Sequence, residues 1–344
     1  MSARRREVLT LLSLLALLPG CAAVGTGTAA RAAAARLTGG ADSAFFDART
    51  GQRLSRRHLL RRLSAVPIIL LGEVHDNTAH HRIRAGLLLE WILCRPDRPA
   101  AVVFEHLDRE HDDALRLAQK LQKGGGDAAL EALLQAARFD RQGWGWPAHR
   151  PLFEAAQASG ATWIAANLSR ASARRLSRDR GARLDPALQA MLESSRWTEG
   201  AQSALAQALE QGHCGLLPAA AVPAVVRLQR LRDAALALPL LDANERRTVL
   251  LAGNAHVRKD YGVPLYLGAL EHEALVIGFE ERPGLSSDPL QAFAHAYDFV
   301  CLTTSPPRED PCAALLPPAA REGAIGAEFT MGEFQRDRER ASGS

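Results

Sequence analysis

Four short apolar runs are separated by long stretches with helical spacing, and each run leads into polar or ionisable residues. The runs are residues 68–71, 101–104, 163–166 and 249–252, and two later runs cover 274–279 and 297–302. Continuous apolar runs of this length are typical of parallel strands that are buried on both faces. The pattern therefore predicts an α/β fold with a mostly parallel sheet flanked by helices.

The residues that follow the runs predict a site. Glu73 and His75 follow the first run, Glu105 follows the second and His256 follows the fourth. Because open parallel sheets bind ligands beyond the carboxyl ends of their strands, we expect these four side chains to share one edge. A Gly-x-x-His motif occurs twice, at 72–75 and 253–256, and a glycine at a strand end permits a tight turn.

Two other groups of residues have alternative interpretations. His80 and His81 are adjacent in a predicted helix over 80–93, so they point to different faces and at most one reaches the site. Trp144 and Trp146 lie in a glycine-rich loop. Their rings either stack on a flat ligand or close the edge of the core.

The sequence predicts a divided α/β domain with a helical insertion. Residues 169–244 show no strand pattern, and about four helices fit there as an inserted subdomain. The α/β domain then comprises 44–168 and 245–305, beginning with a hairpin after which Ser55 caps a helix ending at Leu63. The polar, proline-containing segment 306–344 is expected to be a loose tail.

The N-terminus predicts export. Three arginines at 4–6 precede an apolar stretch over 8–18, and Gly20 precedes Cys21. Residues 1–20 thus resemble a bacterial lipoprotein signal, with cleavage before Cys21 and lipidation of its thiol. An ordinary cleaved signal is the alternative, and export by the general or the twin-arginine route stays open. Residues 21–43, rich in alanine, glycine and threonine, are expected to form a flexible tether.

Charge and cysteine content narrow the possible functions. The signal contains three arginines and one glutamate, so its removal lowers the formal charge from +4 to +2. Without a basic stripe, this balance argues against nucleic acid as a partner. The cysteines lack zinc-finger spacing. In an oxidising compartment Cys301 and Cys312 either form a disulfide or are two unrelated thiols.

Several motifs in matching order resemble the ChaN family of haem-binding bacterial lipoproteins, within the Tiki, TraB and erythromycin-esterase-like superfamily. The longest are LGEVHDN at 71–77 and AGNAHVRKDYGVP at 252–264. The others are residues 80–81, 104–105, 143–144, 150–152, 166–168, 213–218, 229 and 232–234. The resemblance covers the mature chain from about residue 45 to residue 279.

The resemblance implies haem as cofactor, bound at the carboxyl edge of the sheet between two subunits of a haem-induced homodimer. It implies a cofacial haem pair, with a tyrosine on the iron, which we assign to Tyr261. It also implies basic groups from the partner subunit on the propionates, for which His256, Arg258 and Lys259 are the candidates. Phenolate is a hard donor suited to ferric iron, and cations pair with carboxylates. The alternative for Tyr261 is a ring packed on the sheet edge. The expected location is the cell envelope, with a lipid anchor in the outer membrane on the periplasmic side and an outer-membrane haem receptor as a possible partner.

The alternative function is enzymatic. Relatives in the superfamily are described as hydrolases or metal-dependent proteases that use the two Gly-x-x-His motifs and an acidic residue. Glu73, His75, Glu105 and His256 are the candidates for that chemistry, since carboxylates and imidazoles bind divalent metals or activate water. We favour the haem-binding function, because the match extends through residues 213–218 and Tyr261.

Overall fold

The structure is a computed structural model that describes residues 43–122, 124–178, 183–244, 246–268, 273–282, 290–309 and 312. The predicted signal, the predicted lipidation site Cys21, nearly all of the expected tether and most of the expected tail lie outside the described residues. Within the described part of the chain, no helix is both long enough and apolar enough to cross a membrane.

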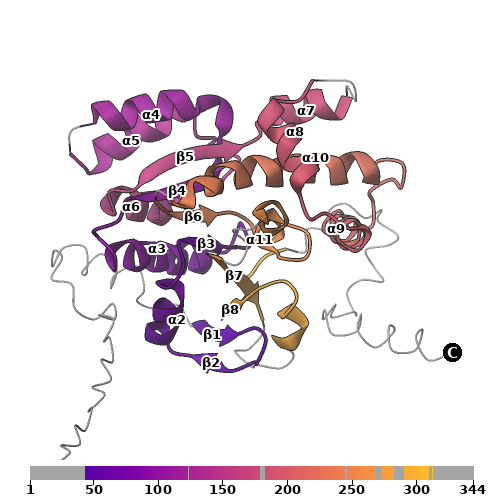
Figure 1. Cartoon of the computed structure of the whole chain (residues 1–344), viewed down its shortest axis with the longest axis horizontal. Coiled ribbons are helices and arrows are strands. Elements are labelled where there is room, and N and C mark those ends of the chain that lie inside the picture. The colour runs from indigo at the N-terminus through magenta and orange to yellow at the C-terminus, as the bar shows by residue number, and fades with distance from the viewer. Residues whose placement is uncertain are drawn as a thin grey trace, which may run out of the picture.

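The sheet has eight strands in the order β2-β1-β8-β7-β3-β6-β4-β5. The strands are β1 (Ser43–Asp47), β2 (Arg53–Leu54), β3 (Ile68–Leu71), β4 (Ala100–Asp108), β5 (Thr162–Asn167), β6 (Arg247–Leu251), β7 (Ala274–Glu281) and β8 (Phe299–Thr303). β1 pairs antiparallel with both β2 and β8, and all the other pairings are parallel. The expected α/β fold with a mostly parallel sheet is confirmed (Figure 1).

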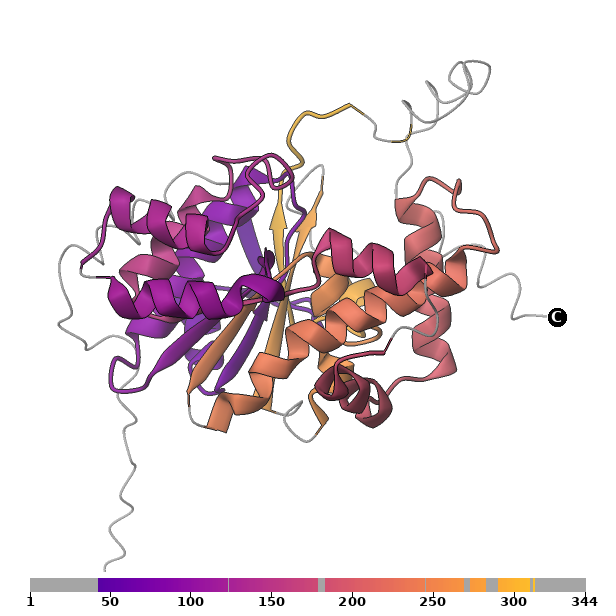
Figure 2. The same cartoon turned by 90° about the horizontal axis from the view of Figure 1, so that it is seen from above.

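Helices cover both faces of the sheet. They are α2 (Arg56–Leu63), α3 (Thr78–Leu93), α4 (Asp112–Leu121), α5 (Asp127–Ala136), α6 (Arg150–Ala158), α7 (Arg170–Arg178), α8 (Pro186–Ser194), α9 (Glu199–Gly212), α10 (Val222–Ala237) and the short α11 (Asn254–Val257). Figure 2 shows the sheet between the purple helices of the N-terminal half and the rose and orange helices that follow β5. Four of these helices, α7 to α10, lie in the segment for which about four were predicted.

The strands alternate between two apolar cores. In β3, Ile69 and Leu71 pack with α2, α3 and α6, whereas Ile68 and Leu70 pack with α10 on the other face. All four side chains are fully buried. Burial on both faces explains why the strand has no polar position and could be recognised from its sequence.

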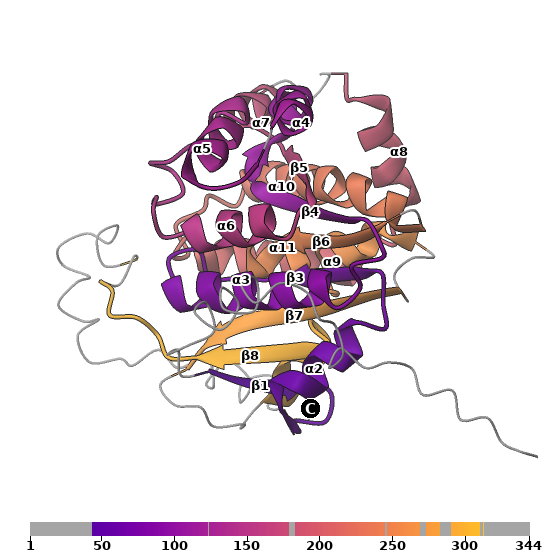
Figure 3. The ribbon, with the colours of Figure 1, turned by 90° about the vertical axis from the view of Figure 1, so that its left-hand side faces the viewer.

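The N-terminal hairpin lies at the end of the sheet that is far from β4 and β5 (Figure 3). The Ser55 side chain accepts a hydrogen bond from His58 N at 3.2 Å, and α2 begins at the next residue and ends at Leu63. The hairpin and the serine cap are therefore confirmed.

Strand β4 is longer than its apolar run. It continues through Glu105 and His106 to Asp108, with an irregular register beside β5 after Phe104. The Asn167 side chain helps to hold this segment, because its Nδ2 donates to Glu105 O at 2.9 Å. Glu105 and His106 therefore belong to the strand itself rather than to the loop after it.

Of the two alternatives left open for Cys301 and Cys312, the structure excludes a disulfide between them. Cys312 bonds to Cys214, across 98 positions of the sequence, and not to Cys301. The Cys301 side chain is fully buried in β8 and packs in the core. The disulfide joins the segment after β8 to the loop between α9 and α10.

Close packing, not turn conformation, explains the two motif glycines. A Cβ atom on Gly72 would lie 2.2 Å from Asn254 Oδ1, and one on Gly253 would lie 2.8 Å from His75 Cε1. Neither glycine has a positive φ. The loops after β3 and β6 therefore touch directly, and this contact brings the two Gly-x-x-His motifs together.

Candidate functional site

The candidate site lies at the carboxyl ends of three adjacent strands, β3, β6 and β4. Leu71, Leu251 and Phe104 are paired across these strands at the same level. Glu73 and His75 follow β3, and Glu105 lies one residue beyond Phe104 in β4. The structure thus brings together chain segments that are more than 140 residues apart in sequence, as in the hydrogen bond between Gly253 and Glu105.

Glu73 is a fully buried carboxylate with a different environment on each oxygen. Oε2 contacts the guanidinium of Arg84 from α3, and His81 Nε2 lies 3.5 Å from the same oxygen. Oε1 faces three imidazoles: His75 Nδ1 at 2.9 Å, and His106 Nε2 and His149 Nε2 at 3.4 Å each. Buried charges require partners of this kind, so Glu73 organises the centre of the site.

Of the two adjacent histidines, only His81 reaches the site. Its Nε2 also lies 3.1 Å from His75 O, whereas His80 accepts from Val74 N at 3.0 Å and contacts Thr303 Oγ1 at 2.8 Å. Burial lowers the pKa of each ring to about 3. Both rings are therefore neutral and serve as hydrogen-bonding groups.

A second buried group links Glu105, His256 and Asp233. His256 Nδ1 lies 2.5 Å from Asp233 Oδ1, and its Nε2 lies 3.3 Å from Glu105 Oε1. Glu105 Oε2 accepts from Gly253 N at 2.6 Å, and Asp233 comes from α10. Both ring nitrogens face carboxylate oxygens, and this arrangement favours a doubly protonated His256.

The pKa values follow from this arrangement. Burial lowers the pKa of His256, but Glu105 and Asp233 outweigh it and raise that pKa to about 10. Burial raises the pKa of Glu105, but the charges of His256 and His75 outweigh it and hold the pKa well below its usual range. Burial raises the pKa of Asp233 to about 6, against the opposing effect of His256. His256 is thus a cation at neutral pH.

His75 is the exposed part of the site. Its side chain is 51% exposed, while that of Glu73 is fully buried. The His75 ring meets the Trp144 ring edge to face at a centroid distance of 5.2 Å. Trp144 and Trp146 also pack partly buried against the core, so Trp144 both closes the core and borders the site.

Tyr261 lies among apolar side chains. It is only 5% exposed and packs with Ala201, Leu205 and Val226 of the helices α9 and α10. The Arg258 guanidinium lies 4.8 Å from the centre of its ring. Burial raises the pKa of Tyr261 to about 12, with Arg258 opposing this shift.

The two basic candidates after His256 already pair with carboxylates. Arg258 donates to both oxygens of Asp260, at 2.9 and 2.7 Å, and Lys259 Nζ donates to Asp298 Oδ1 at 2.7 Å. A ligand carboxylate that binds either cation therefore competes with an acidic side chain of this chain.

Three residues of the site, Arg84, Asp233 and His149, are not among those that the sequence alone predicts. Arg84 and Asp233 are 0% exposed, although the sequence places them in helices with apolar neighbours. Charged residues at core positions of a helix are a recognisable signal, because such groups are almost never buried without partners. His149 had no such signal, since it directly precedes a helix start at Arg150.

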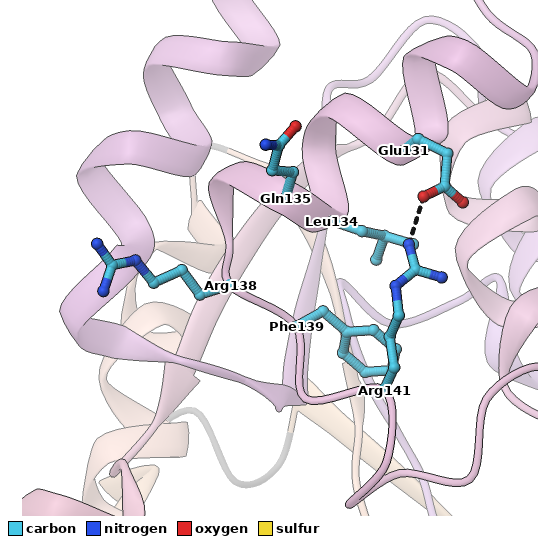
Figure 4. A pocket seen from close by; sticks show the side chains of 6 residues that line it. All are labelled: Glu131, Leu134, Gln135, Arg138, Phe139 and Arg141. Atoms are coloured by element: carbon cyan, nitrogen blue, oxygen red, sulfur yellow. Dashed lines mark hydrogen bonds and ion pairs between the residues drawn. The ribbon is translucent and has the colours of Figure 1, made fainter.

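A surface hollow of about 410 Å³ lies away from these residues. Figure 4 shows its lining beside α5: Glu131, Leu134, Gln135, Arg138, Phe139 and Arg141. An ion pair between Arg141 and Glu131 crosses it. None of the site residues predicted from the sequence lines this hollow.

Fold and site together define an α/β protein with a polar, partly open edge beyond its central strands. A sequence-family profile described as haem-binding uptake, Tiki superfamily, ChaN matches residues 59–267. The match covers more than half of the chain, so the chain belongs to this family, as the motifs suggested. We found no significant match among curated proteins.

Several solved structures are similar to this chain, and the first of the three named here shares its fold. ChaN of Campylobacter jejuni, described with cofacial haem binding, is 20% identical, covers 76% of this chain and 97% of its own, and superposes with a TM-score of 0.60. A mutant erythromycin esterase, EreC, in its open conformation is 13% identical over 78% of this chain and 99% of its own, with a TM-score of 0.40. The type III effector HopBA1 is 13% identical over 73% of this chain and 93% of its own, with a TM-score of 0.39.

His256→Gln should destabilise the protein and change its pH dependence. The raised pKa means that the folded state keeps a proton which the unfolded chain releases near pH 6.5, so this stabilisation is present below pH 6.5 and is lost as pH rises toward 10. We expect the wild type to lose at least about 1.4 kcal/mol over this interval, the equivalent of one pKa unit. At pH 7 the variant should lose about 3 kcal/mol or more, because two carboxylates lose their cation.

The measurement is denaturant unfolding between pH 6 and 10. His213→Gln is the matched control, since His213 is exposed and, within the described residues, the hydrogen bond found for its ring is to Leu209 O of α9. A His256→Gln variant whose stability falls with pH in parallel with the wild type would contradict the assigned charge.

Proposed function

We propose that the mature protein binds haem at the edge formed by the carboxyl ends of β3, β6 and β4, and takes part in haem or iron uptake. Membership of the haem-binding family is the observation that carries this proposal. The open position of His75 beside Trp144 supports the location, since a flat apolar macrocycle requires an accessible edge with aromatic surface.

The side chains at this edge include groups that can bind haem iron and haem propionates. Two of them are candidate iron ligands, and a different argument supports each. Tyr261 follows from the family resemblance, but its ring is 5% exposed and has to move for its oxygen to bind iron. His75 follows from exposure, because its side chain is 51% exposed. Arg258 and Lys259 are the cations for the propionates, in exchange for Asp260 and Asp298.

A hydrolase remains the second candidate, because Glu73, His75, Glu105 and His256 do converge. Their contacts suit binding better than base catalysis. His256 carries a proton between two carboxylates, and one oxygen of Glu73 is held by Arg84. A general base must take a proton from water near neutral pH. His256 has both ring nitrogens protonated, and Glu73 is fully buried, with His75 Nδ1 2.9 Å from its remaining oxygen, Oε1.

Tyr261→Phe distinguishes the two iron ligands. The variant keeps the packed ring and loses only the oxygen, so its melting temperature should stay within about 2 °C of the wild type. With Tyr261 on the iron, the ferric haem spectrum loses its phenolate charge-transfer band, while His75→Gln leaves that band in place. Visible absorption during haem titration of wild type and both variants gives the answer. If both variants bind haem saturably with an unchanged spectrum, neither Tyr261 nor His75 is the iron ligand. If the wild type shows no saturable haem binding, the proposed function is wrong.

Haem binding should promote dimerisation. We propose that two copies share the haem-binding edge, since a ligand that binds only the dimer drives association by mass action. Sedimentation velocity of the mature chain without its lipid should show a shift from monomer to dimer when haem is added. A haem-saturated monomer at the same protein concentration would contradict the shared site.

Lipidation at Cys21 is proposed to attach the protein to the outer membrane on its periplasmic side, where an outer-membrane haem receptor is the expected partner. A diacylated cysteine with an acylated amine exceeds the two anchoring signals that stable attachment needs. Cys21→Ala should give unprocessed precursor or soluble protein in cell fractionation. Cys94→Ala is the control and should remain with the membranes. Equal membrane fractions and equal processing in both variants would exclude the lipid anchor.

A further inference from the structure

Glu73, His106 and His149 form a buried group that the haem-binding proposal does not use. Their ligand atoms all lie within 4.8 Å of one another, and the three residues come from the β3 loop, from β4 and from the residue before α6. Both imidazole Nε2 atoms lie 3.4 Å from the same carboxylate oxygen, Glu73 Oε1. Three segments of the fold therefore bring potential metal-ligand atoms close together around Glu73 Oε1.

His106 gives an independent indication of a ligand. The residue is 3% exposed, and within the described part of the chain neither of its ring nitrogens has a hydrogen-bond partner. Its approach to Glu73 Oε1 at 3.4 Å lacks hydrogen-bond geometry. A buried polar group without a partner costs about 1–3 kcal/mol. A bound cation at this point would satisfy His106 Nε2.

We propose that Glu73, His106 and His149 bind one divalent first-row transition-metal ion, of the kind represented by zinc. Imidazole and carboxylate are the donors that such ions take in sites with three protein ligands and one open position. With bonds of about 2.0–2.1 Å, the ligand atoms of a tetrahedral zinc site are about 3.4 Å apart. Two of the three separations in this group already have that value, and the third closes by at most about 1.4 Å from the 4.8 Å limit.

Charge and protonation are compatible with a cation here. The buried set contains three carboxylates, those of Glu73, Glu105 and Asp233, against the two cations Arg84 and His256. Both histidine ligands are neutral, since burial lowers the pKa of His149 to about 4 and holds that of His106 well below its usual range. Arg84 occupies Glu73 Oε2, so the carboxylate would bind the ion through Oε1 alone.

Two more exposed side chains, Trp144 and His75, lie beside the group. The Trp144 ring lies 4.5 Å from the His106 ring and 5.2 Å from the His75 ring, between centroids. His75 is half exposed and contacts Glu73 Oε1 at 2.9 Å. Both side chains are more exposed than His106 and His149, and the open coordination position would face them.

Zinc binding to the metal-free, haem-free mature protein tests the proposal by competition with a chromophoric chelator. The wild type should bind one zinc ion per chain, and His106→Gln and His149→Gln should each weaken this binding at least tenfold. His213→Gln, on an exposed histidine, should bind zinc as the wild type does. Loading with Co²⁺ gives a second readout, since low-symmetry four-coordinate cobalt has intense visible bands that the aqueous ion lacks.

The zinc and cobalt measurements can each contradict the proposed metal site. Zinc affinity unchanged in both ligand variants, or a wild type that neither competes with the chelator nor shows intense cobalt bands, would overturn the site. Should either variant fail to fold by circular dichroism, the wild-type stoichiometry and cobalt spectrum still decide. Because no haem is present, failure here leaves the haem proposal intact, and failure of haem titration leaves the zinc result intact.

Discussion

The need to compensate the buried carboxylate of Glu73 is the constraint on which the site depends. An ionised carboxylate cannot stay buried without cations or hydrogen-bond donors around it. Arg84 supplies the cation, and it also donates to Leu71 O at 3.0 Å and to Ala252 O at 3.3 Å. One arginine from α3 thereby joins Glu73 to the carboxyl ends of both β3 and β6. The ion pair positions the loops from which His75 and His256 extend.

The site is asymmetric, because the two Gly-x-x-His motifs place their histidines differently. After Gly72 the chain brings His75 beside Glu73, at 2.9 Å, and leaves the ring half exposed. After Gly253 the chain turns into α11, where Asn254 bonds to the backbone of Phe279 while His256 is buried between two carboxylates. One motif therefore provides an accessible imidazole, and the other provides a fixed internal cation.

The sequence was sufficient for the strands and for the convergence of Glu73, His75, Glu105 and His256. Buried parallel strands have no polar positions, so their ends can be recognised wherever polarity begins. That same rule placed the end of β4 too early, since Glu105 and His106 are polar residues that continue the strand because they find buried partners.

Contacts between distant segments could not be predicted in this way. The pairing of Cys312 with Cys214 depends on where the chain passes after β8, which no local pattern encodes. His149 and Arg84 reach Glu73 because α6 and α3 pack on the same face of the sheet. Side-chain periodicity predicts that a helix has a buried face, but not which residue of another element that face will meet.

The position of iron in the haem-loaded protein tests the central claim most directly. Anomalous scattering from a crystal grown with haem would locate the metal without assumptions about its ligand. The proposed haem site predicts iron beyond the carboxyl ends of β3, β6 and β4, within bonding distance of Tyr261 or His75. Iron bound at another surface, such as the hollow beside α5, would contradict it.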